Sequence, residues 1–135
     1  MRTKLGALAV AFALLYSGVP VVAHHSFAAE YDVNKPVTVN GAVTKFEWTN
    51  PHAHVYVDVV GEKGVVTNWN FEMASPNILE RNGWSRRALN VGDKVTLKGF
   101  SGKVAATRGV VNSITLADGR ALFAGPGAAD NPPDR

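Results

Sequence analysis

Residues 48–58 have the sequence WTNPHAHVYVD, and this stretch decides the fold that we expect. Asn50-Pro51 opens it with a turn, because proline cannot donate a backbone hydrogen bond and Asn-Pro favours turn initiation. Apolar and polar residues then alternate, so they point to opposite faces of an extended chain. The stretch therefore predicts a half-buried β-strand whose polar face carries His52, His54, Tyr56 and Asp58. The two histidines are separated by about 7 Å along such a strand.

The flanking segments show the same alternation, so we expect a strand on each side. Residues 37–48 predict a long strand whose apolar phase slips by one residue between Gly41 and Lys45, which indicates a β-bulge. Residues 61–64 predict a hairpin turn, and residues 65–73 predict a third strand with an inward aromatic series. If these strands form a hairpin, the polar residues of the third strand share the face of the histidines: Asn68, Asn70 and Glu72.

The rest of the chain completes a β-β-β-α-β-β order. Ser75 as N-cap, Pro76 at the first helical position and Gly83 as the stop predict a short helix. Residues 94–100 and 110–116 predict two more strands, followed by a short return over residues 120–123. An all-β chain with one short helix between strands three and four predicts a five-stranded OB-fold-like Greek-key barrel. A small β-sandwich is the alternative.

The first 23 residues predict an export signal. Arg2 and Lys4 precede a 12-residue apolar run that is too short to span a bilayer, and Ala23 suits cleavage by signal peptidase. Removing 23 of 135 residues leaves 112, which is enough for one domain. We expect the mature chain to contain no transmembrane segment and to be located in the periplasm or secreted. We expect an N-terminal arm over residues 24–36, an OB-like domain over 37–124 and a disordered tail over 125–135.

Charge and cysteine content exclude several classes of function. Cleavage after Ala23 leaves 12 basic residues against 11 acidic ones, so the basic character of the whole chain largely disappears. A nucleic-acid-binding domain normally carries a basic stripe, and this chain has none, so we expect no nucleic-acid partner. The absence of cysteine excludes disulfides, thiolate metal sites and thiol catalysis.

Several short segments together resemble a family of small exported bacterial proteins of unknown function. They are HHSFAAEYD at residues 24–32, WTNPH at 48–52, SPN at 75–77, GW at 83–84 and LADG at 116–119. The resemblance spans nearly the whole mature domain. It implies export and a single OB-like domain, and it supplies no catalytic residues.

The histidines predict a metal site. Cleavage after Ala23 makes His24 the first residue, so its free amine and its imidazole together can chelate one ion. A third nitrogen from His52 or His54 would complete a histidine brace, a nitrogen set that suits Cu(II), with Zn(II) as the second choice. His25 is a further candidate ligand, and Glu72 or Asp58 would be an additional ligand or an orienting carboxylate.

A metal-free interaction module is the alternative function. Strands two and three are where OB-folds commonly bind ligands, and their polar face would then contact a protein, a peptide or a small molecule. Its residues are Tyr56, Asp58, Asn68 and Asn70, together with the histidines. A protein partner in the periplasm is compatible with either function. No carboxylate pair, Ser-His-Asp pattern or phosphate-binding loop stands out, so the sequence does not favour an enzyme.

Overall fold

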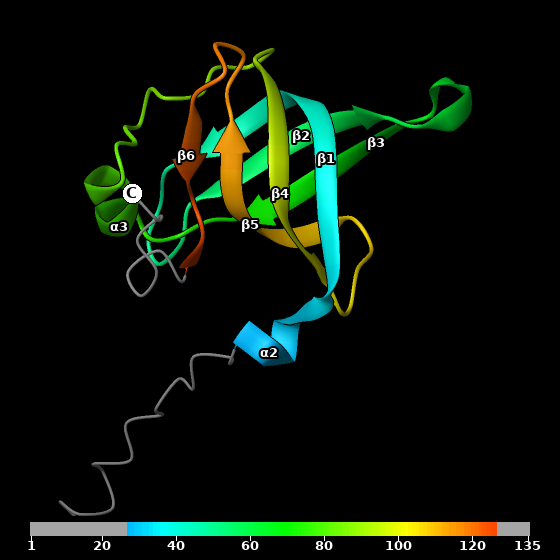
Figure 1. The fold of residues 1–135 in the computed structure, drawn as a ribbon, viewed down its shortest axis with the longest axis horizontal. Coiled ribbons are helices and arrows are strands. Elements are labelled where there is room, and N and C mark those ends of the chain that lie inside the picture. The colour runs from blue at the N-terminus through cyan, green and yellow to red at the C-terminus, as the bar shows by residue number, and fades with distance from the viewer. Residues whose placement is uncertain (1–26, 127–135) are drawn as a thin grey trace, which may run out of the picture.

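The computed structural model describes residues 27–126 of the chain, which form an all-β fold with one short helix between β3 and β4 (Figure 1). The strands are β1 (Tyr31–Glu47), β2 (His54–Val60), β3 (Val66–Glu72), β4 (Lys94–Gly102), β5 (Arg108–Thr115) and β6 (Ala121–Phe123). The helical segments are α2 (Phe27–Glu30), a 3-10 turn (Glu62–Gly64) and α3 (Pro76–Arg81). Among the described residues, no helix has the length and apolar character needed to cross a membrane.

Five strands close into a ring. Their hydrogen-bonded order is β3-β2-β1-β4-β5-β6, and a parallel pairing between β3 and β5 joins the two ends of the five-stranded part. Asn70, Phe71 and Glu72 of β3 pair there with Arg108, Gly109 and Val110 of β5. The short β6 pairs only with β5. This ring, with α3 between β3 and β4, is the OB-like barrel that the sequence predicts.

β1 is longer than its sequence pattern indicates. The expected start was residue 37, whereas the strand begins at Tyr31, where it pairs with Gly102 of β4. The intervening residues 33–36 are polar or exposed, so they lack the alternation that marks a half-buried strand. Further along β1, the register with β2 shifts between Val43 and Lys45, which confirms the predicted bulge.

The core lies inside the ring and is continued by α3 at one end. The most buried large side chains come from different elements of the barrel and its cap: Phe71, Met73, Leu79, Leu97 and Ile114. Pro76 occupies the start of α3, and Gly83, with φ +87°, follows its end, as the sequence predicts. Trp84 is buried beside the helix and donates a hydrogen bond from Nε1 to the backbone oxygen of Phe123 (2.8 Å).

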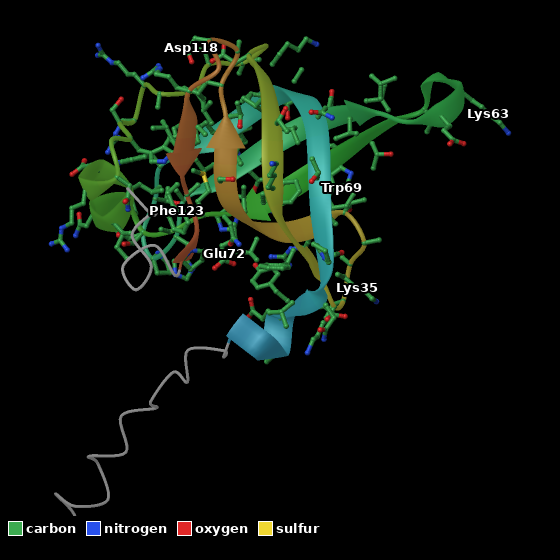
Figure 2. All side chains as sticks on the ribbon, viewed as in Figure 1. Lys35, Lys63, Trp69, Glu72, Asp118 and Phe123 are labelled. Carbon is green, nitrogen blue, oxygen red and sulfur yellow. The ribbon has the colours of Figure 1, made fainter. Side chains whose placement is uncertain are left out.

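The β2–β3 hairpin projects beyond the ring, with Lys63 at its tip (Figures 1 and 2). Lys63 has φ +61°, a left-handed conformation suited to this tight turn. Val60 and Val66 are cross-strand partners near the tip and are 69% and 56% exposed. An apolar pair therefore borders the polar face of the hairpin at its outer end.

Candidate functional site

The polar residues predicted to share one sheet face do so. Three cross-strand pairs of β2 and β3 follow one another along the hairpin: His54 with Glu72, Tyr56 with Asn70, and Asp58 with Asn68. The backbone pairing continues past the end of β2, because Ala53 exchanges hydrogen bonds with Ala74 and Met73. His52 therefore extends the same row, whereas Val55, Val57 and Phe71 fill the core on the opposite face.

His52 is held by Glu72, and Glu72 is held in turn by Tyr31. The Nδ1 atom of His52 lies 2.5 Å from Oε1 of Glu72, and the Tyr31 hydroxyl donates to Oε2 at 2.6 Å. Tyr31 is only 6% exposed, and its burial, reinforced by the bond to Glu72, raises the pKa of its hydroxyl well above the ordinary value. Glu72, labelled in Figure 2, thus joins the start of β1 to the histidine face.

His54 is oriented in a similar way by an amide. Its Nδ1 atom lies 3.0 Å from Oδ1 of Asn70. A carboxylate or amide oxygen only accepts hydrogen bonds, so Nδ1 is the donor in both His52 and His54. In the neutral imidazole the Nε2 atom then carries the lone pair, and no partner for either Nε2 lies among residues 27–126. Each ring therefore has one acceptor nitrogen that is not engaged by a hydrogen bond within the described residues.

Tyr56 belongs to a second network on the same face. Its hydroxyl donates to Oε2 of Glu47 (2.9 Å), and Oε1 of Glu47 forms an ion pair with Lys45. The hydrogen bonds from Lys45 and Tyr56 lower the pKa of Glu47, whereas partial burial and the bond to Glu47 raise the pKa of Tyr56. Glu47 was absent from the predicted site, although its parity in β1, opposite to that of Phe46 and Trp48, places it on this face.

Asp58 and Asn68 form the outermost polar pair. Asn68 donates through Nδ2 to Oδ1 of Asp58 (2.8 Å) and to the hydroxyl of Thr44 at the β1 bulge (3.0 Å). Asp58 also borders an open hollow of about 400 Å³ between β1, β2 and β4. This pair lies two cross-strand positions from His54, so it is separate from the histidine end of the face.

Arg108 is the cation that sequence reasoning missed. The parallel β3–β5 pairing places it opposite Asn70. Its positive charge lowers the pKa of Tyr31 and of Tyr56, but this effect is smaller than the burial and the hydrogen bonds that raise both pKa values. Its position depends on closure of the ring, which no local pattern around residue 108 reveals. Among residues 27–126, Arg108 has no ion-pair or side-chain hydrogen-bond partner.

Two of the predicted metal ligands, His24 and His25, lie outside the described residues. Within residues 27–126, no group of three or more His, Cys, Asp or Glu side chains could hold a metal ion. The two strand histidines therefore supply two nitrogen donors, and a metal site would need at least one more from elsewhere. The carboxylate of Glu72 is already engaged by His52 and Tyr31, which suits an orienting role better than direct coordination.

Comparison with known proteins identifies a family of unknown function. No curated protein and no solved structure matches the chain. The model of a family of unknown function, DUF6152, matches residues 12–112, most of the chain. The chain therefore belongs to the DUF6152 family.

Proposed function

We propose that this is an exported protein that binds one metal ion, with copper favoured over zinc, through His52, His54 and the mature N-terminus. The observation that carries the proposal is the orientation of the two imidazoles. A metal-ligating histidine almost always donates its other ring N–H to a carboxylate, a carbonyl or water, which fixes the tautomer and makes the ligand more basic. His52 and His54 both have this arrangement at Nδ1, through Glu72 and Asn70.

The remaining donors in this proposal are the amine and imidazole of His24, with His25 as a further candidate. Tyr31 anchors the start of β1 to Glu72, directly beside His52. His24 precedes Tyr31 by seven positions in the sequence, a stretch that spans about 25 Å at most. The anchor therefore supports the idea that the mature N-terminus is within reach of the histidine face. Three or four nitrogen donors favour Cu(II), which accepts tetragonal geometry.

Export belongs to the same proposal, because the brace exists only if a signal peptidase cleaves after Ala23. The positive start and the short apolar run of residues 1–23 support such cleavage. The HHSFAAEYD and WTNPH segments contain three of the four histidines of the chain, and His54 follows two residues after the second segment, which supports a common role for them. The protein would then handle or deliver copper in the periplasm.

Calorimetry and EPR with Cu(II) test the proposal on protein whose His24 start has been verified by intact mass. We expect one type-2 copper per chain, with nitrogen hyperfine structure that is lost in His52→Ala and His54→Ala. Adding a methionine before His24 should weaken binding sharply, because it displaces the chelating amine. Glu72→Gln should weaken binding by about 10–100-fold through loss of the orienting carboxylate. Unchanged affinity in the extended protein would refute the brace, and no stoichiometric binding of copper or zinc would refute the metal site.

A metal-free interaction module remains the second candidate, favoured by the exposed valine pair at the hairpin tip. Val60 and Val66 continue the face of Tyr56, Asn70, Asp58 and Asn68 outward, so polar and apolar groups together could contact a protein or peptide. This function predicts that a pull-down partner is lost in Val60→Asp and retained in His52→Ala and in metal-free buffer. The reverse result would favour the metal site.

A further inference from the structure

A pocket between α2 and the segment joining β4 to β5 carries two opposite charges that have no partner in the described part of the chain. Its volume is about 360 Å³, at the small end of the range for ligand sites, and it is lined by Ala29, Glu30, Tyr31, Val104, Ala105 and Arg108. Within residues 27–126, neither Glu30 nor Arg108 has an ion-pair or side-chain hydrogen-bond partner, and the two do not pair with each other. One wall therefore presents a carboxylate and another a guanidinium.

Backbone bonds hold the walls of this pocket together. The amide of Lys103 donates to the backbone oxygen of Glu30 (2.9 Å), which ties α2 to the start of the β4–β5 connection. The amide of Arg108 donates to the oxygen of Ala105 (3.1 Å), which closes the turn that leads into β5. Tyr31, which is buried and bonded to Glu72, also lines the pocket. The backbone of Glu30 and that of Arg108 are thus each held by a hydrogen bond.

We propose that this pocket binds a free aliphatic α-amino acid. The ligand's carboxylate would accept hydrogen bonds from the guanidinium of Arg108, which is suited to bidentate recognition of a planar carboxylate. Its ammonium group would donate to the carboxylate of Glu30. The small apolar residues Ala29, Val104 and Ala105 would contact an aliphatic side chain. A zwitterion satisfies both unpaired charges, whereas a simple acid or a simple amine leaves one of them unmatched. The proposal is independent of the metal site.

Three related ligands test the charge complementarity on the mature wild-type protein, by calorimetry in buffer containing EDTA. L-leucine should bind saturably with one site per chain. 4-methylpentanoate, which lacks the amine, and 3-methylbutylamine, which lacks the carboxylate, should each bind at least about tenfold more weakly, since a charge-assisted contact is lost. Equal affinity for leucine and 4-methylpentanoate, or no saturable leucine binding, would overturn the proposal.

Two substitutions and a control locate the binding. Arg108→Gln and Glu30→Gln should each weaken leucine binding by at least about tenfold. Arg87→Gln removes an exposed charge away from the pocket and should leave binding unchanged. Amino acids also chelate copper, so leucine could bind through a metal ion. If leucine binding requires added Cu(II) and is absent in EDTA, the proposal of an amino-acid pocket is refuted and the metal proposal is unaffected. Leucine binding in EDTA by a protein that fails to bind copper would support the pocket alone.

Discussion

Replacing Tyr31 by phenylalanine should destabilise the fold by removing one hydrogen bond while leaving the aromatic ring in place. The hydroxyl donates to a carboxylate oxygen of Glu72 at 2.6 Å, and the tyrosine is almost fully buried. Hydrogen bonds to charged groups contribute about 1.5–3 kcal/mol net, and burial limits compensation by water, so we expect the free energy of unfolding to fall by about 2 kcal/mol. The packing term is nearly constant because the two side chains differ by a single hydroxyl group.

Tyr56 supplies a matched control for this experiment. Its hydroxyl also donates to a glutamate, Glu47, but at 2.9 Å and from a partly exposed position. Tyr56→Phe should therefore cost about 0.5–1 kcal/mol, less than Tyr31→Phe. Urea unfolding followed by tryptophan fluorescence measures both values.

A double-mutant cycle between Tyr31→Phe and Glu72→Gln isolates the bond between them. We expect a coupling energy of about 1.5 kcal/mol, because the two groups are in direct contact. If Tyr31→Phe costs less than about 0.5 kcal/mol and shows no coupling to Glu72, then Tyr31 does not anchor β1 to the histidine face. The mature N-terminus would then have no anchor that brings it within reach of His52.

Three further predictions test the barrel and its polar face. Gly99→Ala should lower the free energy of unfolding by about 3 kcal/mol or more in a urea titration, because the added Cβ would overlap backbone atoms of β5. In the control Gly61→Ala, the added Cβ meets its nearest atom at 3.4 Å, so stability should change by less than about 0.5 kcal/mol. Similar values for the two variants would contradict this packing. Trp84→Phe should cost about 1–2 kcal/mol, since it removes the donor to the oxygen of Phe123, and an unchanged thermal midpoint would refute that contribution. Because the pKa of Glu47 is lowered from 4.5, its pairing stabilises the folded chain above that pH and is lost as the pH falls through the folded-state pKa. Glu47→Gln should therefore destabilise the protein near neutrality and converge with wild type in acid, and a constant difference across pH would contradict the assignment.

Sequence patterns predicted the parts of the fold that depend on local chemistry. The alternation after Pro51 identified the strand and its two faces, and Pro76 with Gly83 marked the helix within one or two residues. The phase slip near Lys45 located the bulge, because changing the register moves side chains between faces. The start of β1 was missed, since the residues between Tyr31 and Val37 show no alternation, although β4 pairs with part of this segment.

The site was predictable where one hairpin forms it and unpredictable where the ring closes. His54, Asn70 and Glu72 share a face because β2 and β3 are adjacent in sequence, so parity alone places them. The contacts of Tyr31 with Glu72 and the position of Arg108 beside Asn70 depend on segments about 40 residues apart that meet only in the barrel. No local pattern carries that information.

The most direct test of the metal proposal is NMR of protein carrying ¹⁵N-labelled histidine, before and after addition of one equivalent of Zn(II) as a diamagnetic probe. In the metal-free protein, a neutral ring of His52 or His54 should carry its proton on Nδ1 and its lone pair on Nε2, because Nδ1 faces an acceptor oxygen in both residues. Metal should then shift the Nε2 resonances of both residues and leave their Nδ1 protons in place. Protonated Nε2 atoms in the neutral rings, or resonances that stay unchanged at full zinc occupancy, would contradict the claim that this face is built to bind a metal.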